Sequence, residues 1–372
     1  MSVSDTLSLL LSLNACQCFD VRLWKKIQGA GLDAAEFVRG GEKLWERLGI
    51  PDRSRPILAD LIARGWAQRE LDACAKMNVH LLTCEDADYP NSLFDLKDPP
   101  LLLYLWGMRK SLPSRNIAVV GTRKSSPYGK RVAKEIGHTC SRHGWGLVSG
   151  GARGIDGAAH EGALEAQGSN FAVLGTGIDQ VFPSEHALLF EHIKQSGALV
   201  SEYPLGVTGR PWRFPRRNRI ISALADRLVV VEAPHRSGAM ITARCSMDLG
   251  REVWAVPGRI DEDVCSGSNQ LLFDGAHPLI GLELFFGTGE SQKTLFPPSA
   301  GNAAPVAPDT ASLDSTERLL LQLLSEQGDR TVDNLATEAK MSAADVSKKM
   351  VLLAAKGWVF CSAPGRYRAC SS

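Results

Sequence analysis

A dense basic segment near the middle of the chain offers the groups that hold a nucleic-acid strand. Five arginines lie in ten residues, interleaved with two aromatic rings, in Arg210-Pro211-Trp212-Arg213-Phe214-Pro215-Arg216-Arg217-Asn218-Arg219. No acidic residue occurs between Glu202 and Asp226. Because guanidinium groups bind phosphates and aromatic faces stack on bases, the segment predicts contact with single-stranded nucleic acid. Two alternatives stay open: a solvated arginine face, and core positions for Trp212 and Phe214.

Two other segments carry glycines, hydroxyls and cations that suit an anion. The first, Val120 to Gly129, follows an apolar run and contains Arg123 and Lys124. It lacks the GxxxxGK[ST] pattern, so neither a Walker lysine nor a Mg²⁺ ligand is expected. The second is Ser149-Gly150-Gly151-Ala152-Arg153-Gly154-Ile155-Asp156-Gly157, which precedes a helical stretch. Glycine lets the backbone approach an anion, and a helix N-terminus attracts one, so a phosphate site is predicted; ordinary polar turns are the alternative.

A fourth segment, Glu232 to Ala243, completes this group. Its Ser237, Gly238 and Thr242 could add hydroxyl and amide groups to the same anion site. His235 has no accompanying nucleophile pattern, so an ordinary loop histidine is favoured over a catalytic one. The turn Gly175-Thr176-Gly177 lacks the last glycine of GxGxxG and does not predict a dinucleotide site.

Short apolar runs that alternate with helical stretches must position these segments. The runs are Ile117 to Val120, Gly146 to Val148, Phe171 to Leu174, Ala198 to Val200, Leu228 to Val231 and Val253 to Val256. This alternation predicts a parallel sheet covered by helices on both faces, a Rossmann-like α/β domain over residues 79–286. All four segments that could carry chemistry then lie at or near one edge of the sheet.

The flanking regions have a different character. Residues 1–78 show helical periodicity broken by glycines, with a turn at 28–32 that fits either a helix-hairpin-helix or a plain bundle. Residues 287–312 are rich in Gly, Pro, Ser and Ala and predict a flexible linker. Residues 313–372 predict three helices and a hairpin, a winged-helix domain. Its third helix is nearly neutral, so contact with a protein or regulation is favoured over DNA binding.

Composition excludes several classes of protein. The 372 residues carry a formal net charge of +1, so a polyanion would have to bind a local basic patch. No apolar stretch reaches the roughly 18 residues of a membrane span, and no Lys or Arg precedes the leucine-rich run near the N-terminus, as a signal peptide requires. The nine cysteines form no CxxC pair and the eight histidines no metal pattern. We therefore expect a cytoplasmic protein with reduced thiols and neither metal nor cofactor.

These segments, in this order, resemble the DNA-processing protein A family (DprA/Smf). The resemblance covers most of residues 85–282, and the FPxRNR block and the SGGxRGID loop are its most specific parts. It is carried by Asp88-Tyr89-Pro90, Asp98-Pro99-Pro100, Val120 to Arg123, Ser149 to Asp156, Phe214 to Ile221, Ser237 to Ala243 and Ala255 to Gly258. Family members often add an N-terminal module similar to a sterile alpha motif and a C-terminal winged helix, in agreement with both flanks.

The resemblance implies a protein without catalytic turnover. Such a protein binds and protects incoming single-stranded DNA during natural transformation and loads the RecA recombinase on it. The resemblance also implies a homodimer, with a surface near Leu271, Leu272 and Phe273. The residues expected to contact DNA are Arg123, Lys124, Gly150, Gly151, Arg153, Gly154, Arg216, Arg217, Asn218, Arg219, Ser237, Gly238 and Thr242.

Two rival functions remain at this stage. A similar fold with a glycine loop occurs in nucleotide phosphoribohydrolases, which need a positioned carboxylate; the available ones are Asp156, Glu161 and Glu232, in no paired arrangement. A transcriptional regulator that senses a nucleotide and reads duplex DNA is the second rival. The nearly neutral third helix of the C-terminal domain weighs against it.

Overall fold

The structure, a computed structural model, describes residues 3–16, 21–109, 111–286, 314–327, 330–355, 358–363 and 366–369. The chain divides into two compact units, Met1–Gly289 and Glu290–Ser372. The linker predicted over 287–312 lies outside the described residues. Within the described ranges, no helix is long and apolar enough to cross a membrane.

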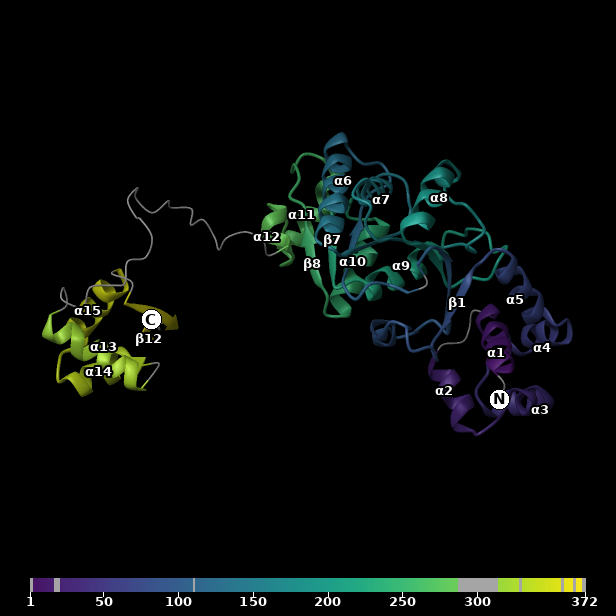
Figure 1. The fold of residues 1–372 in the computed structure, drawn as a ribbon, viewed down its shortest axis with the longest axis horizontal. Helices are drawn as coiled ribbons and strands as arrows, with labels where there is room; N and C mark the ends of the chain where they lie inside the picture. Colours follow the sequence, from purple (N-terminus) through teal and green to yellow (C-terminus); the bar gives the residue numbers. More distant parts are fainter. Residues whose placement is uncertain are drawn as a thin grey trace. The chain divides into compact units, whose positions relative to one another are not determined.

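A nine-stranded sheet forms the centre of the first unit, in the order β1-β2-β6-β5-β4-β3-β7-β8-β9 (Figure 1). The strands from β6 to β9 pair in parallel, whereas β2 pairs antiparallel with both β1 and β6. The bounds are β1 (His80–Thr83), β2 (Leu102–Gly107), β3 (Asn116–Val120), β4 (Gly146–Ser149), β5 (Asn170–Leu174), β6 (Ala198–Ser201), β7 (Arg227–Val230), β8 (Glu252–Ala255) and β9 (His277–Pro278). All six predicted strands are present, and the sheet is the expected Rossmann-like one with an added antiparallel edge.

Helices cover both faces of this sheet because the central strands are apolar on both sides. In β3, Ile117 and Val119 pack in a core with α6 (Pro127–Arg142), α7 (Ile155–Glu165) and α12 (Leu282–Phe286). Ala118 and Val120 point the other way, into the core under α9 (Arg213–Leu224), α10 (Gly238–Asp248) and α11 (Ser266–Phe273). Since side chains alternate along a strand, this apolar run requires two covering layers. Figure 1 shows α6 and α7 side by side in one layer.

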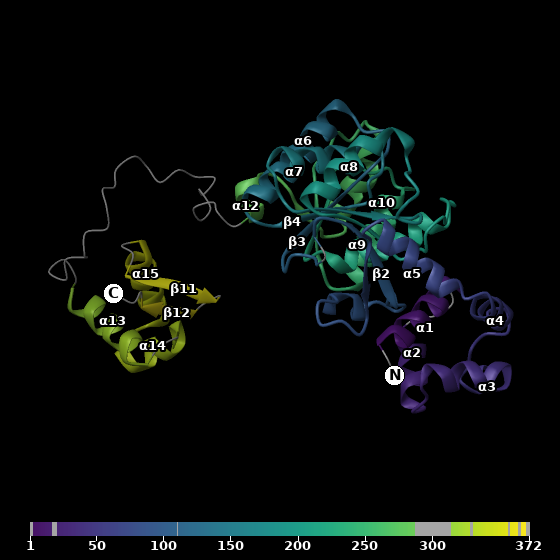
Figure 2. The ribbon, with the colours of Figure 1, turned by 45° about the vertical axis from the view of Figure 1, so that its right-hand side comes forward.

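The N-terminal helices pack against the antiparallel edge. Helices α1 (Val3–Ala15), α2 (Val21–Gly29), α3 (Ala34–Arg47), α4 (Arg55–Ala63) and α5 (Trp66–Lys76) form one group in Figure 2. Their core, which includes Trp24 and Phe37, is continuous with Tyr104 of β2 and with Phe190 of α8 (Ala187–Ser196). These helices belong to the same compact unit as the sheet, so the domain boundary at residue 78 stays a prediction.

The second unit contains the helices and hairpin expected from the sequence. These are α13 (Ser315–Gln327), β10 (Arg330–Thr331), α14 (Val332–Ala339), α15 (Ala343–Ala355), β11 (Val359–Ala363) and β12 (Arg366–Ala369). The strands form an antiparallel sheet in the order β10-β12-β11, and a small core includes Leu320, Leu335 and Leu353. Assignment to the winged-helix class stays a prediction.

The strand order reverses beside β3, and this reversal places the functional edge of the sheet. Strands β4, β5 and β6 follow β3 on one side, whereas β7 lies on its other side. In open α/β sheets a crevice forms at the carboxyl ends of the strands where the order reverses. The loops that follow these strands meet there: the Thr122 amide donates to the Glu232 carbonyl at 2.7 Å, and the Ile155 amide to the Thr122 carbonyl at 3.3 Å.

Candidate nucleic-acid interface

A cleft of about 950 Å³ opens at this reversal point. Its walls come from the loop after β3, the first turns of α9, and the segment that runs from the end of β7 into α10. The predicted residues that line it are Arg123, Lys124, Arg217, Asn218, Ser237, Gly238 and Thr242. The glycine loop after β4 adds Ala152 and Asp156 to the lining. All four segments therefore meet in one cavity, although they are far apart in the sequence.

The cleft is strongly cationic. Arg123, Lys124, Arg236 and Arg244 line it with exposed side chains, and Arg217 lies at its base. Among the described residues of the lining, Asp156 is the single acid. A concave surface with one sign of charge concentrates counter-ions, so this cleft suits a polyanion.

Arg217 is buried beneath the cleft and is held by backbone carbonyls. Its guanidinium donates to the carbonyl oxygens of Gly150, at 2.7 Å, and of Val173. Burial lowers the pKa of Arg217 to about 10, and the Asp156 carboxylate opposes this shift. The guanidinium is therefore charged at neutral pH and adds a positive potential at the floor of the cleft.

The glycine loop after β4 has a different role from the one predicted. The amides of Gly150 and Ala152 donate to the Asp156 carboxylate at 3.1 and 3.4 Å. A Cβ on Gly150 would lie 2.6 Å from the Arg217 Nη2 atom. The Gly150 amide, expected to hold a phosphate, is thus occupied by an internal carboxylate, and the missing side chain makes room for Arg217.

The other glycines of this loop shape the backbone. Gly151 and Gly154 have φ angles of 62° and 77°, and residues that carry a Cβ rarely adopt such positive values. A Cβ on Gly154 would also lie 2.4 Å from the Thr122 carbonyl oxygen. Neither glycine is among the residues that line the cleft. Gly154 lets the loops after β3 and β4 pass close together, and Gly151 makes room for the Phe190 ring of α8.

Arg153 also lies outside the cleft lining. Its side chain is exposed and forms an ion pair with Glu185. The hydrogen bond from Arg153 lowers the pKa of Glu185 to about 2, so the pair is ionised at neutral pH. The sequence could not reveal this pairing, because the two residues lie in different loops.

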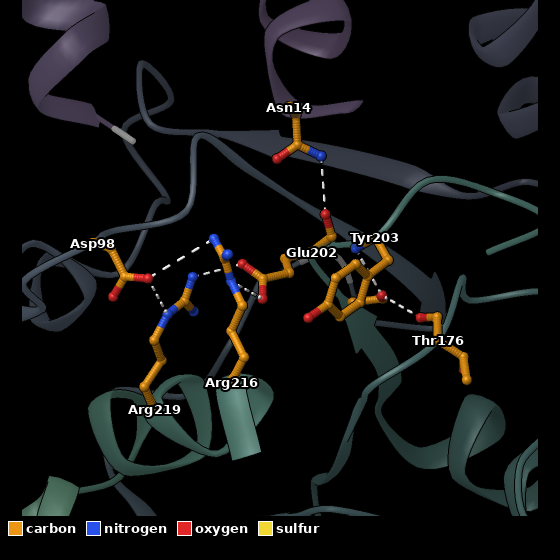
Figure 3. Close-up of polar contacts among 8 residues, drawn as sticks. Asn14, Asp98, Thr176, Glu202, Tyr203, Arg216 and Arg219 are labelled. Atoms are coloured by element: carbon orange, nitrogen blue, oxygen red, sulfur yellow. Dashed lines mark hydrogen bonds and ion pairs between the residues drawn. The ribbon is translucent and has the colours of Figure 1, made fainter. Parts of the chain in front are cut away.

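Arg216 and Arg219 were expected beside Arg217 but point away from the cleft. The Arg219 guanidinium contacts Asp98 at 3.0 Å and Glu202 at 2.6 Å, and Arg216 lies 3.8 and 3.6 Å from the same carboxylates (Figure 3). Successive residues of a helix point in directions about 100° apart, so one basic run faces several environments. Figure 3 also shows Asn14 of the N-terminal helices, whose amide donates to the Glu202 carbonyl at 2.9 Å.

Opposite charges stabilise one another in the α9 ion-pair cluster, which consists of Asp98, Glu202, Arg216 and Arg219. Burial lowers the pKa of Arg219, but the carboxylates of Glu202 and Asp98 raise it, and the net shift is upward. Glu202 and Arg219 are both nearly inaccessible to solvent. We infer that this cluster anchors α9, which carries Arg217 and Asn218 to the cleft.

The polar residues of the α10 turn fit the prediction more closely. Asn218 donates from its side-chain nitrogen to the Gly238 carbonyl at 3.1 Å, and this bond joins α9 to α10. Thr242 is buried and its hydroxyl donates to the same carbonyl at 3.2 Å. Ser237 occupies the N-cap position of α10. These residues line the cleft, but Asn218 and Thr242 also hold its wall together.

Phe182, Arg236 and Arg244 are among the lining residues that sequence reasoning did not assign to the site. The position of Arg244 could have been predicted, because it lies two helical turns after Ser237 and therefore on the same side of a predicted helix. That of Phe182 could not, since it comes from the loop after β5. Of the two aromatic residues in the basic segment, Phe214 lines the cleft and Trp212 does not.

Two of the three carboxylates considered for a rival enzyme, Glu232 and Asp156, are engaged in the fold. Glu232 is buried and accepts hydrogen bonds from the amide and hydroxyl of Ser126, at 2.9 and 2.5 Å. Burial raises the pKa of Asp156, whereas Arg217 and the backbone amides that donate hydrogen bonds to the Asp156 carboxylate lower it. Glu161 is exposed on α7 and outside the cleft lining.

The expected dimer surface needs one correction. Leu271 is 2% exposed and belongs to the core under α10 and α11, so it cannot contact a partner. Leu272 is partly buried against the same core, whereas Phe273 is 87% exposed. The helix period explains the difference, because Leu271 and Phe273 are two positions apart and therefore lie about 200° apart around α11.

Comparisons with known proteins agree with this architecture. A family model described as "DNA recombination-mediator protein A" matches residues 80–286. Protein Smf of Escherichia coli K12 is 37% identical over 300 residues, which cover 79% of each chain. DNA processing protein DprA of Bacillus subtilis is 35% identical over 219 residues, which cover 59% of this chain and 74% of that protein.

Solved structures point the same way. DNA processing protein A from Streptococcus pneumoniae aligns with a TM-score of 0.57 and 30% identity, over 64% of this chain and 83% of that one. The Helicobacter pylori protein, whose structure describes its single-stranded DNA binding mode, aligns with a TM-score of 0.51 and 30% identity, over 56% of this chain and 94% of that one. The chain therefore belongs to the DNA recombination-mediator protein A family, that of the DprA and Smf proteins.

Proposed function

We propose that the cleft binds single-stranded DNA and that the chain has no catalytic turnover. The observation that carries this proposal is the set of four exposed cations, Arg123, Lys124, Arg236 and Arg244, in one cavity. In the part of the chain that the structure describes, none of the four forms an ion pair with a carboxylate. Their charge is therefore available to phosphates. The single-stranded DNA binding of the Helicobacter pylori relative supports this choice of polyanion.

The protein would act on incoming DNA in natural transformation, in the cytoplasm. In this role it protects the strand and transfers it to the RecA recombinase. Family membership supports this role, which the cleft alone would not define. In a strand-exchange assay we expect the protein to accelerate RecA on a strand covered by single-strand-binding protein.

We also propose that two copies associate near the end of the sheet. Phe273 and Ile280 are 87% and 73% exposed, and such apolar side chains are typical of an interface. Two clefts along one strand would raise avidity without new contacts. Phe273→Asp should shift the sedimentation-equilibrium mass to that of a monomer, whereas Leu188→Asp, at a 75% exposed position on α8, should not.

A competition assay tests the central proposal. Labelled single-stranded oligonucleotide is bound to the full chain, and unlabelled single-stranded or duplex DNA of the same sequence is added. We expect the single strand to compete at least about tenfold better, because only its bases can reach the cleft walls. Equal competition by the duplex, or release of free base from a nucleoside monophosphate, would contradict the proposal.

A further inference from the structure

A row of flat side chains crosses the cationic cleft. The Arg123 guanidinium lies over the Phe214 ring, with its carbon 5.5 Å from the ring centroid. The Phe214 ring in turn packs against Phe182, with centroids 5.2 Å apart and planes inclined at 36°. All three residues line the cleft and come from three different loops or helices.

The glycines around Phe214 hold this row in place. A Cβ on Gly175 would lie 2.8 Å from Phe214 Cδ1, and one on Gly209 would lie 3.2 Å from Phe214 Cζ. The Gly-Thr-Gly turn after β5, which did not fit a dinucleotide site, thus makes room for an aromatic ring. Phe214 is partly buried between these neighbours, so it is the fixed member of the row.

Phe182 is the exposed end of the row. Its side chain is 47% exposed although it packs against Phe214, and it shares the cleft with Arg123 and Lys124. A half-exposed apolar ring among cations suits a ligand that is flat and uncharged in one part and anionic in another. A nucleotide has this composition, since its base stacks on aromatic faces and its phosphate binds cations.

We propose that Phe182 is a base-stacking residue of the cleft and that Phe214 is its support. This inference rests on the proposed binding of single-stranded DNA and adds the group that contacts a nucleobase. The contact is indifferent to which base is bound, because every base has a flat face. A base presented by a free mononucleotide would fit the same chemistry, so the test must separate a strand from a single nucleotide.

Abasic DNA separates stacking from phosphate binding. Affinities of the full chain are measured for an oligothymidylate and for an abasic strand of equal length, with thymidine monophosphate as a competitor. The variants are Phe182→Ala, Phe182→Leu, which keeps bulk without a flat ring, and Phe182→Tyr. The control is Phe94→Ala, because Phe94 is 38% exposed, packs on Tyr89 at 5.1 Å and lies near Lys25, but is outside the cleft lining.

We expect Phe182→Ala and Phe182→Leu to weaken oligothymidylate binding about tenfold, in the range of stacking on one aromatic ring. Binding of the abasic strand should change less than about twofold, and Phe182→Tyr and Phe94→Ala should resemble the unmodified protein. Equal losses for both strands, or no loss for either, would overturn the inference. Full competition by thymidine monophosphate at equal nucleotide concentration would assign the stacking to a free nucleotide and overturn it for DNA. A wild-type chain that binds neither strand would instead refute the proposed function, and this inference with it.

Discussion

The cleft and the cluster beneath α9 use the same residue type for opposite purposes. In the cluster, Arg216 and Arg219 face Asp98 and Glu202, and their charges are neutralised within the fold. In the cleft, Arg123 and its neighbouring cations face solvent and one buried carboxylate. We infer from this difference that nearby carboxylates decide whether an arginine of a basic segment is held within the fold or stays available to a ligand.

Removing the central carboxylate of the cluster should have the largest effect. Glu202→Gln leaves the buried Arg219 guanidinium and the partly buried Arg216 guanidinium short of a counter-charge. Breaking a buried ion pair costs about 4 kcal/mol of the free energy of unfolding. Urea unfolding measures this loss. Asp98→Asn is the graded control, because Asp98 is 44% exposed and its loss should cost less. Equal stability of Glu202→Gln and the unmodified chain would show that the cluster does not anchor α9.

His160 can be compared with Arg219, because it is also a buried basic group but has the Asn170 amide, and not a carboxylate, as its partner. Burial lowers its pKa to about 4, and its ring nitrogen Nδ1 lies 2.5 Å from the Asn170 side-chain oxygen. The unfolded chain binds a proton at this histidine near its ordinary pKa of about 6.5, whereas the folded chain does so only near 4. Its stabilising effect is therefore complete above about pH 6.5 and is lost as the pH falls toward about 4.

The expected size is about 2 kcal/mol between about pH 7.5 and about pH 5. His160→Gln should remove this component, so the variant's free energy of unfolding should fall less over the same range. Parallel urea titrations of both proteins at the two pH values measure the difference. His235→Gln is the control, because His235 is exposed. Parallel pH profiles for His160→Gln and the unmodified chain would contradict the assignment.

On the cleft side, Arg244 should matter for DNA and not for stability. Arg244→Ala removes an exposed cation of the α10 wall, so we expect single-stranded DNA to bind about tenfold more weakly and unfolding to change by less than about 0.5 kcal/mol. Fluorescence anisotropy and urea unfolding measure the two effects. Arg259→Ala, at an exposed residue outside the cleft lining, should alter neither. A fall in stability without a fall in affinity would place Arg244 with the structural arginines.

The smallest effect is expected at Arg153. Its exposed guanidinium is held by Glu185 and lies outside the cleft lining, although its loop was expected to contact DNA. Exposed ion pairs add little stability, so Arg153→Ala should leave the melting temperature unchanged within error. DNA affinity should change less than about twofold. A tenfold loss of affinity would show that the strand reaches beyond the cleft to this loop.

Most strands of the sheet could be predicted from the sequence, whereas the directions of the arginine side chains on α9 could not. The buried strands were visible because each is a short apolar run between helical stretches, whereas β1 and β2 extend the sheet by antiparallel pairing that these runs do not reveal. The loops that form the cleft followed from the rule that parallel strands end at one edge. The roles of Arg216 and Arg219 depend on Asp98, which lies more than a hundred residues away in the sequence. A local sequence pattern cannot reveal such a partner.

The salt dependence of single-stranded DNA binding tests the central claim most directly. Four exposed cations that each displace a counter-ion from a phosphate should give a slope of about −3 in log affinity against log salt. Arg123→Ala should make the slope shallower by about 0.7, because one phosphate contact is lost. Affinity that does not depend on salt, or a slope unchanged by Arg123→Ala, would contradict the account of the cleft as a phosphate-binding surface.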